Sequence, residues 1–307
     1  MAVYLPIAEM SVNLFVLLAM GAAVGFLSGL FGVGGGFLIT PLLLFYNIPP
    51  AIAVATGANQ VIAASFSGAL AHFKRGTLDV KLGTMLLVGG IAGSSIGAYV
   101  FALLRALGQL DLFISLSYVA FLGIVGSLML IESVNTIFKT RSGSAPTLKK
   151  PGQHHWVHRL PLKMRFRTSK LFVSIIPVLG IGAGIGFLAA IIGVGGGFLM
   201  VPALIYLLRV PTNVVVGTSL FQIVFVAAFT TLVHSTANHS VDIVLALILM
   251  VGGVAGAQYG AKAGQRLRGE QLRALLALLV LAVALRLALD LFITPADRYM
   301  LSTPEGL

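Results

Sequence analysis

The chain has 307 residues, of which 58% are hydrophobic and only 9% are charged, whereas a soluble domain usually carries about 25% charged residues, so an ordinary soluble fold is excluded. The formal net charge of +11 would indicate nucleic-acid binding in a soluble protein, but here the basic residues lie between hydrophobic blocks, where membrane topology explains them. Cysteine is absent, which excludes disulfides, thiolate metal sites and a cysteine nucleophile.

Long apolar blocks recur along the chain, and each approaches the roughly 20 residues that a helix needs to cross a bilayer. In chain order, we predict spanning helices at 11–31, 51–73, 83–104, 111–133, 171–192, 213–234, 243–263 and 272–293. Two further apolar segments, 37–46 and 198–208, are too short to cross about 30 Å untilted. The predicted fold class is an all-α polytopic membrane protein.

An internal repeat divides the chain into two halves. The stretch from Gly25 to Pro41 recurs, with few changes, from Gly186 to Pro202. The similarity continues downstream, where Gln60 matches Gln222. We therefore predict one integrated transport domain made of two repeats of about five segments each. Its parts are the first repeat, the linker and the second repeat, at 1–138, 139–170 and 171–307.

The linker at 139–170 contains nine Lys and Arg residues and no acidic residue, which is typical of a cytoplasmic loop. With five segments per half, all Lys and Arg except Arg105, Arg286 and Arg298 then fall on the cytoplasmic side. An odd number of segments makes the second repeat enter the membrane from the opposite side, so the repeats are inverted, as in many secondary transporters. Both termini are expected outside a cell inner membrane.

Each repeat carries a glycine cluster that a continuous helix would not tolerate, because each glycine costs about 1 kcal/mol relative to alanine. We expect a break there, followed by a half-helix or a hairpin arm, with Pro41 and Pro202 near its first turn. Two such arms meeting near the midplane would direct helix N-termini and free amides at one anion. The alternative is that these glycines only permit close helix packing. The candidate substrate-binding glycines are Gly34, Gly35, Gly36, Gly195, Gly196 and Gly197.

Polar residues follow each break at matching positions within apolar helices. They are Thr56, Asn59, Gln60, Ser65 and Ser67 in the first repeat, and Thr218, Ser219, Gln222, Thr230 and Thr231 in the second. The Thr and Gln of each repeat are four residues apart and share a helix face. The substrate-binding hypothesis takes Thr56, Asn59, Gln60, Thr218, Ser219 and Gln222. The alternative is hydrogen bonding between helices.

Three ionisable residues are candidates for gating or for the transport pathway. His72 and His234 occupy equivalent positions, and the alternative role for both is an interfacial cap. Arg286 could act on the pathway or pair with Asp290, four residues later. No second ligand accompanies either histidine at i+3 or i+4, so no metal site is predicted. No complete catalytic constellation is visible, so no catalytic residue is assigned and we predict that the chain is not an enzyme. The glycines spaced by four from Gly89 and from Gly252 favour close helix packing.

The paired Gly-x-Gly-Gly-Gly motifs, each followed five residues later by proline, resemble those of the sulfite exporter TauE/SafE family. The resemblance covers nearly the whole chain and implies a permease for sulfite, thiosulfate, organosulfonates or related small anions. It implies a site at the glycines and at the polar residues that follow, including Gln60 and Gln222. The second repeat departs from the first in having Phe221 where the first has Asn59. The expected partners are a small anionic substrate and the lipid bilayer, with a homo-oligomer left open, and no cofactor or nucleic acid is expected.

Carboxylates near the membrane centre are scarce in the sequence, since Glu132 and Asp290 fall toward helix ends. Conventional proton relays use buried Asp or Glu, so the sequence favours export driven by membrane potential, by alternating access. Two alternatives stay open at this point. One is an ion-coupled importer of a sulfur-containing anion, and the other is an anion channel.

Overall fold

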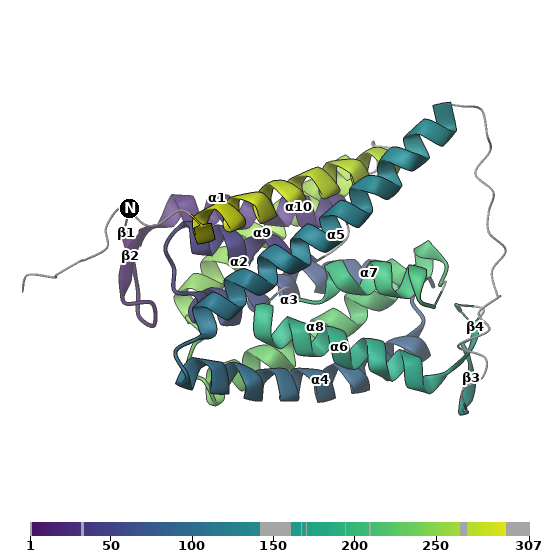
Figure 1. Cartoon of the computed structure of the whole chain (residues 1–307), viewed down its shortest axis with the longest axis horizontal. Coiled ribbons are helices and arrows are strands. Elements are labelled where there is room, and N and C mark those ends of the chain that lie inside the picture. Colours follow the sequence, from purple (N-terminus) through teal and green to yellow (C-terminus); the bar gives the residue numbers. More distant parts are fainter. Residues whose placement is uncertain are drawn as a thin grey trace, which may run out of the picture.

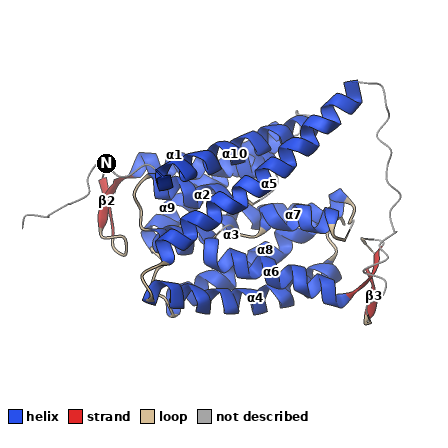
Figure 2. Ribbon diagram, viewed as in Figure 1, coloured by secondary structure: helices blue, strands red, loops and turns tan. Residues whose placement is uncertain are grey.

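The computed structural model describes residues 2–31, 34–141, 161–166, 168–169, 171–193, 195–208, 210–264 and 269–292. Most of the predicted linker, residues 142–160, lies outside them. The described chain forms ten helices and two short hairpins (Figures 1 and 2). The first half contains β1 (Ala2–Leu5), β2 (Met10–Asn13), α1 (Leu14–Phe31), α2 (Gly36–Phe45), α3 (Pro50–Lys74), α4 (Val80–Ala106) and α5 (Leu110–Arg141). The second half contains β3 (Lys163–Phe166), β4 (Leu171–Ser174), α6 (Ile175–Ile192), α7 (Gly197–Tyr206), α8 (Thr212–Thr236), α9 (Ile243–Gly264) and α10 (Gly269–Phe292).

The expected order of five helices per half is found, but some boundaries differ from the prediction. α5 continues past Ser133 into the first residues of the predicted linker. Residues 171–174 were predicted to be helical and instead form β4, which pairs with β3 in an antiparallel hairpin. α6 begins only after Ser174, whose hydroxyl accepts a hydrogen bond from the Ile176 amide at 3.3 Å. A serine cap and a run of apolar, β-compatible residues before it explain the later start.

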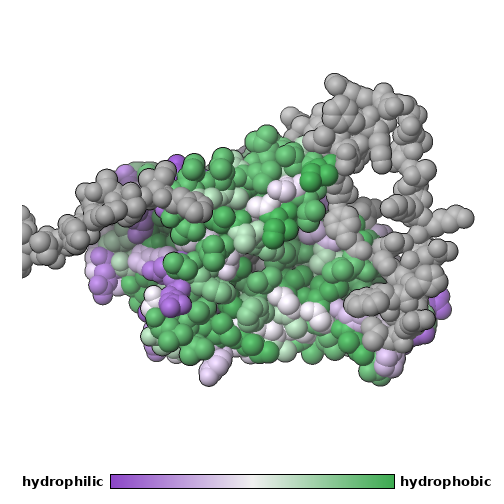
Figure 3. Space-filling view, viewed as in Figure 1, coloured by the Kyte–Doolittle hydropathy of each residue, from purple (hydrophilic) through white to green (hydrophobic). Residues whose placement is uncertain are grey.

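Among the described residues, six helices are long and apolar enough to cross a membrane, namely α4, α5, α6, α8, α9 and α10. α3 has 25 residues and carries several polar side chains, and it is not among these six. Figure 3 shows hydrophobic side chains over the middle of the molecule and hydrophilic ones gathered toward its two ends. This distribution fits a bilayer around the middle, and it confirms an all-α polytopic membrane protein.

The two halves are interleaved rather than placed side by side as separate bundles. α1 packs along α9, and α4 packs along α6, so the first helix of each half lies against the fourth helix of the other. α3 packs against α8, and α5 against α10. Short hairpins precede α1 and α6 at opposite ends of the molecule (Figure 1).

Glycines make the closest of these contacts possible. A Cβ atom added at Gly93 of α4 would overlap the backbone of Ala183 in α6, and one added at Gly256 of α9 would overlap the backbone of Ala22 in α1. A Cβ atom added to any of four further glycines would also lie within 2.6 Å of the facing backbone, namely Gly89, Gly97, Gly252 and Gly260. The prediction that glycines at every fourth position serve helix packing is confirmed.

Candidate functional site

The helix is interrupted at the glycine cluster of each half, as predicted. Gly34 and Gly35 have φ of 87° and 70°, and Gly195 and Gly196 have φ of 72° and 75°. Side chains disfavour these left-handed conformations, which is why glycine is required there. α2 then begins at Gly36 and α7 at Gly197, each ten residues long. At 1.5 Å per residue each helix is about 15 Å long, half of a bilayer core.

The prolines of the short helices do not lie where the sequence placed them. Pro41 and Pro202 were predicted near the first turn, but each is the sixth residue of its helix and lies inside it. A proline at that position lacks the amide that would bond the carbonyl four residues earlier. The carbonyls that lose this amide partner are those of Phe37 and Phe198.

The two breaks meet in the middle of the molecule. The rings of Phe37 and Phe198, which follow the breaks, stack with centroids 4.5 Å apart and planes at 21°. A Cβ atom added at Gly34 would lie 3.6 Å from Cγ1 of Val61 in α3, and one added at Gly195 would lie 2.7 Å from the same atom. The N-termini of α2 and α7 therefore reach one side chain, Val61, which is buried. The candidate substrate-binding glycines of the two breaks are also buried.

A hydroxyl without a partner lies at the first break. A Cβ atom added at Gly34 would be 3.2 Å from Oγ of Ser65. This hydroxyl is fully buried and makes no hydrogen bond within the described chain. Ser28 is also buried, and its Oγ would lie 3.2 Å from a Cβ atom added at Gly35. The equivalent positions of the second repeat are Ala189 and Ala227, so the first break carries more donors than the second.

The free Ser65 hydroxyl leads to a prediction in which stability and binding change in opposite directions. A buried polar group without a partner costs about 1–3 kcal/mol. Ser65→Ala should therefore raise the free energy of unfolding by about 1 kcal/mol in a detergent melt while weakening anion binding about tenfold. Ser95→Ala is the control, because Ser95 is exposed on α4 and already donates to the Ile91 carbonyl at 2.8 Å. Unchanged affinity in Ser65→Ala would remove Ser65 from the site.

The other predicted polar residues take part in contacts between helices. The Thr56 hydroxyl accepts from the Asp242 amide at 3.0 Å, and the Thr218 hydroxyl accepts from the Asp79 amide at 3.2 Å. Nε2 of Gln60 donates to the Gly21 carbonyl at 3.0 Å. For these three residues the structure shows the interhelical role that the sequence left open.

Asn59 and Ser219 bond to the backbone of their own helices, and Gln222 lies beside another helix. Asn59 donates to the Thr56 carbonyl at 3.3 Å, and Ser219 donates to the Val216 carbonyl at 3.0 Å. Gln222 lies against Gly90 of α4. Oε1 of Gln60 and Oε1 of Gln222 are buried without a partner among the described residues. Neither glutamine is among the nearest neighbours of the break glycines, so their predicted place in the substrate site remains a prediction.

The two histidines have different surroundings despite their equivalent positions. His234 is fully buried, with Nε2 2.9 Å from the Ala190 carbonyl and Nδ1 2.8 Å from Nδ2 of Asn238. His72 is half-buried, with Nδ1 2.9 Å from the Thr77 hydroxyl. His72 thus contacts a residue just past the end of α3, whereas His234 joins the end of α8 to α6. The gating role of both histidines stays a prediction. Within the described ranges, no three His, Asp or Glu side chains lie together as a metal would require.

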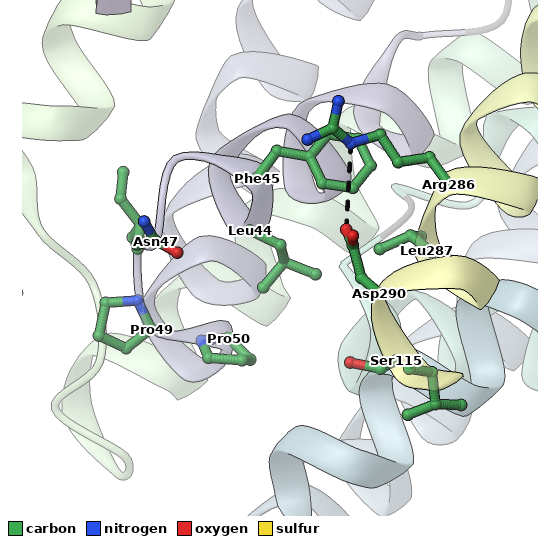
Figure 4. A pocket seen from close by; sticks show the side chains of 11 residues that line it. Leu44, Phe45, Asn47, Pro49, Pro50, Ser115, Arg286, Leu287 and Asp290 are labelled. Atoms are coloured by element: carbon green, nitrogen blue, oxygen red, sulfur yellow. Dashed lines mark ion pairs between the residues drawn. The ribbon is translucent and has the colours of Figure 1, made fainter. Parts of the chain in front are cut away.

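Arg286 lies apart from the breaks, at the far end of α2 (Figure 4). Its guanidinium is 4.7 Å from the ring centre of Phe45, and Nε is 4.0 Å from Oδ2 of Asp290. The pair is exposed, with 66% and 56% of the side chains accessible, so it contributes little to stability. It lines a cavity of about 500 Å³ with Asn47, Ser115 and several apolar residues. The predicted pairing with Asp290 is found, and a pathway role for Arg286 stays a prediction.

Asp79 and Asp242 are buried carboxylates for which the sequence predicted no role. Asp79 and Asp242 are 2% and 0% exposed. They stand in polar stretches between apolar blocks, and each occupies the position before a helix of its half, where Asp is a common cap. The match between Asp79 and Asp242 in the two repeats was the available signal.

Comparison with known proteins places these features in a family context. Residues 17–287 match the family described as sulfite exporter TauE/SafE. The chain is 28% identical over 285 residues to the probable membrane transporter protein YunE of Bacillus subtilis (strain 168), covering 89% of this chain and 96% of that protein. It is 33% identical over 278 residues to a probable membrane transporter protein of Xylella fastidiosa (strain 9a5c), covering 89% and 94%. A shorter match, 43% over 58 residues, covers 19% of this chain and 13% of the Arabidopsis thaliana sulfite exporter TauE/SafE family protein 5. No solved structure matches the chain.

Proposed function

Because this chain belongs to the sulfite exporter TauE/SafE family of membrane transporters, we propose that it exports a small sulfur oxyanion or organosulfonate. Movement is outward across the cytoplasmic membrane, driven by the membrane potential, and proceeds by alternating access. The observation that carries this proposal is the meeting of the two glycine breaks at Val61.

The meeting point has the chemistry of an anion site. Two helix N-termini and the amides of the glycines before them supply positive partial charge without burying a lysine. A sulfite or sulfonate group has several oxygens, so it can accept from several of these donors at once. The Ser65 hydroxyl beside Gly34 adds a side-chain donor. Non-helical backbone at this depth in a membrane is tolerated only where it is buried in protein or lines a water-filled cavity.

The arrangement of the two halves supports alternating access. The β1–β2 and β3–β4 hairpins that precede the first helix of each half lie at opposite ends of the molecule (Figure 1), as inverted repeats require. The break glycines and Val61 are buried, which fits a closed state that opens toward one end at a time. An open anion channel needs a continuous pore instead.

Orientation in the membrane follows from charge. With the end that holds Lys74, Arg75, Lys81 and the β3–β4 hairpin placed in the cytoplasm, the positive-inside rule is satisfied. Both termini then lie outside, and an anion moving outward follows an interior-negative potential. That potential contributes about 2.3 kcal/mol per charge per 100 mV.

Proteoliposomes containing the purified protein test this function. Loaded with sulfite, thiosulfate or methanesulfonate, they should release at least one of these anions faster when a potassium gradient makes the interior negative. Efflux should saturate, and unlabelled anion outside should exchange for labelled anion inside, as a carrier requires. Efflux that is unchanged by potential at fixed pH would count against potential-driven export, and accumulation only with a proton or sodium gradient would favour the ion-coupled importer.

A further inference from the structure

Asp79 joins three segments at the end of the molecule that holds β3 and β4. Its Oδ1 accepts from the Leu82 amide at 3.1 Å and so caps α4 of its own half. Its Oδ2 accepts from the amide and the hydroxyl of Ser169, at 2.9 and 2.7 Å, in the turn of the β3–β4 hairpin of the other half. Its amide donates to the Thr218 hydroxyl on α8, also in the other half.

Asp242 makes the corresponding backbone contacts at the opposite end, without a hydroxyl on its Oδ2 among the described residues. Its Oδ1 accepts from the Leu245 amide at 3.1 Å and caps α9. Its Oδ2 accepts from the Ile7 amide at 2.9 Å, in the turn of the β1–β2 hairpin. Its amide donates to the Thr56 hydroxyl on α3. Asp79 and Asp242 thus form two equivalent clusters, each of which ties the two halves together at one end.

Each cluster contains more hydrogen bonds than a helix cap needs. A cap requires one acceptor at the helix start, yet each carboxylate also uses its second oxygen on the other half. The clusters lie on the α3–α8 pair, which also carries Val61. An opening between the halves would therefore have to begin at one of these clusters. One further contact crosses between the halves at each end, from Lys81 to the Arg165 carbonyl and from Arg105 to the Asn238 carbonyl.

We infer that Asp79 and Asp242 are positioning residues of the transport cycle, and that each holds one of two gates closed. The Asp79 gate closes the β3–β4 end, and the Asp242 gate closes the β1–β2 end. Both are formed in this structure, which corresponds to the occluded state. Access from one end requires its gate to break while the other stays intact. This inference rests on the proposed alternating access but not on the identity of the anion.

The absence of cysteine makes a side-specific test possible. Val61→Cys places one thiol at the meeting point of the breaks, and a membrane-impermeant maleimide is added to either side of oriented proteoliposomes. The exposed positions Ser11 and Lys163, replaced by cysteine in separate proteins, identify the side to which each hairpin faces. Asp79→Asn keeps the shape but replaces an acceptor oxygen by a donor group. It should raise labelling of Cys at 61 at least tenfold from the β3–β4 side, and Asp242→Asn should do so from the β1–β2 side.

A second pair of variants protects the test against loss of folding. Thr218→Val and Thr56→Val remove only the hydroxyl of each cluster and should reproduce the effects of Asp79→Asn and Asp242→Asn on the same sides. Asp111→Asn removes an exposed carboxylate at the start of α5 and should leave labelling unchanged. All proteins are compared by size-exclusion chromatography, and the variants of either pair that elute as the native protein are scored.

The outcomes separate this inference from the proposed substrate. Increases from opposite sides support the two gates even if none of the three sulfur anions is transported, in which case the substrate proposal alone fails. Increases from the same side for both variants, or equal increases from both sides, would overturn the gates. So would unchanged labelling in variants that elute as the native protein.

Discussion

Replacing Gly186 by alanine is expected to disrupt the packing of α6 along α4, whereas replacing Gly184 on the same helix is expected to be tolerated. A Cβ atom at Gly186 would overlap the backbone carbonyl group of Gly90, and the backbone of a packed helix cannot move aside locally. A Cβ atom at Gly184 would have no neighbouring atom within 4 Å. We expect Gly186→Ala to cost about 3 kcal/mol or more.

The control variant on the same helix is not expected to lose stability. Gly184→Ala adds a better helix former in open space, so it should be neutral or stabilising by up to about 1 kcal/mol. Thermal melts in detergent and the yield of monodisperse protein measure both effects. Gly25→Ala should behave like Gly186→Ala, because its Cβ would overlap the backbone of Gly253 in α9. Equal melting temperatures for Gly184→Ala and Gly186→Ala would contradict the helix spacing described here.

Valine at Gly35 or Gly196 is expected to abolish anion binding. Both glycines have a positive φ, which costs a side chain about 1–2 kcal/mol. A Cβ atom would also lie 2.8 Å from Cβ of Ser28 in the first case and 2.8 Å from Cγ2 of Ile185 in the second. The N-termini of α2 and α7 would then move from their meeting point. Binding of sulfite, thiosulfate and methanesulfonate to purified protein should fall at least 100-fold, or about 2.7 kcal/mol.

Gly108→Val is the control for the backbone strain alone. Gly108 has φ of 68° and no atom within 4 Å of an added Cβ, and it lies between α4 and α5 rather than at a break. This variant should lose a similar amount of backbone stability and keep its affinity for anions. If Gly108→Val weakened binding as much as Gly196→Val, the loss would reflect general destabilisation and not the geometry of the breaks.

Local sequence signals accounted for the helices and for their interruptions. Twenty-residue apolar blocks can only be helices in lipid, and clustered glycines interrupt a helix wherever it lies. Boundaries were less certain when two local signals competed. The apolar run after residue 170 fitted a helix by hydropathy, yet Ser174 caps a later start and the residues before it pair as β4.

Partners distant in the sequence could not be read from it. The same helix face of α3 carries Thr56 and Gln60, as the spacing of four predicts, but the sequence does not say what that face meets. The structure turns it toward α9 and α1, with Thr56 on Asp242 and Gln60 on Gly21. Residues closer to the breaks, Ser65 and Val61, were recognised as site neighbours only from the fold.

Hydropathy, the internal repeat and the glycine clusters are enough to establish that this protein crosses the membrane as helices, consists of two related halves, and is broken in each half at Gly-x-Gly-Gly-Gly. These properties depend on solvent and on local backbone energetics. The meeting of the two breaks at Val61, and the ties that Asp79 and Asp242 make between the halves, are visible only in the folded molecule. Those contacts join residues far apart in the chain, up to 186 residues for Thr56 and Asp242, and helix packing selects them from many partners of the same chemistry.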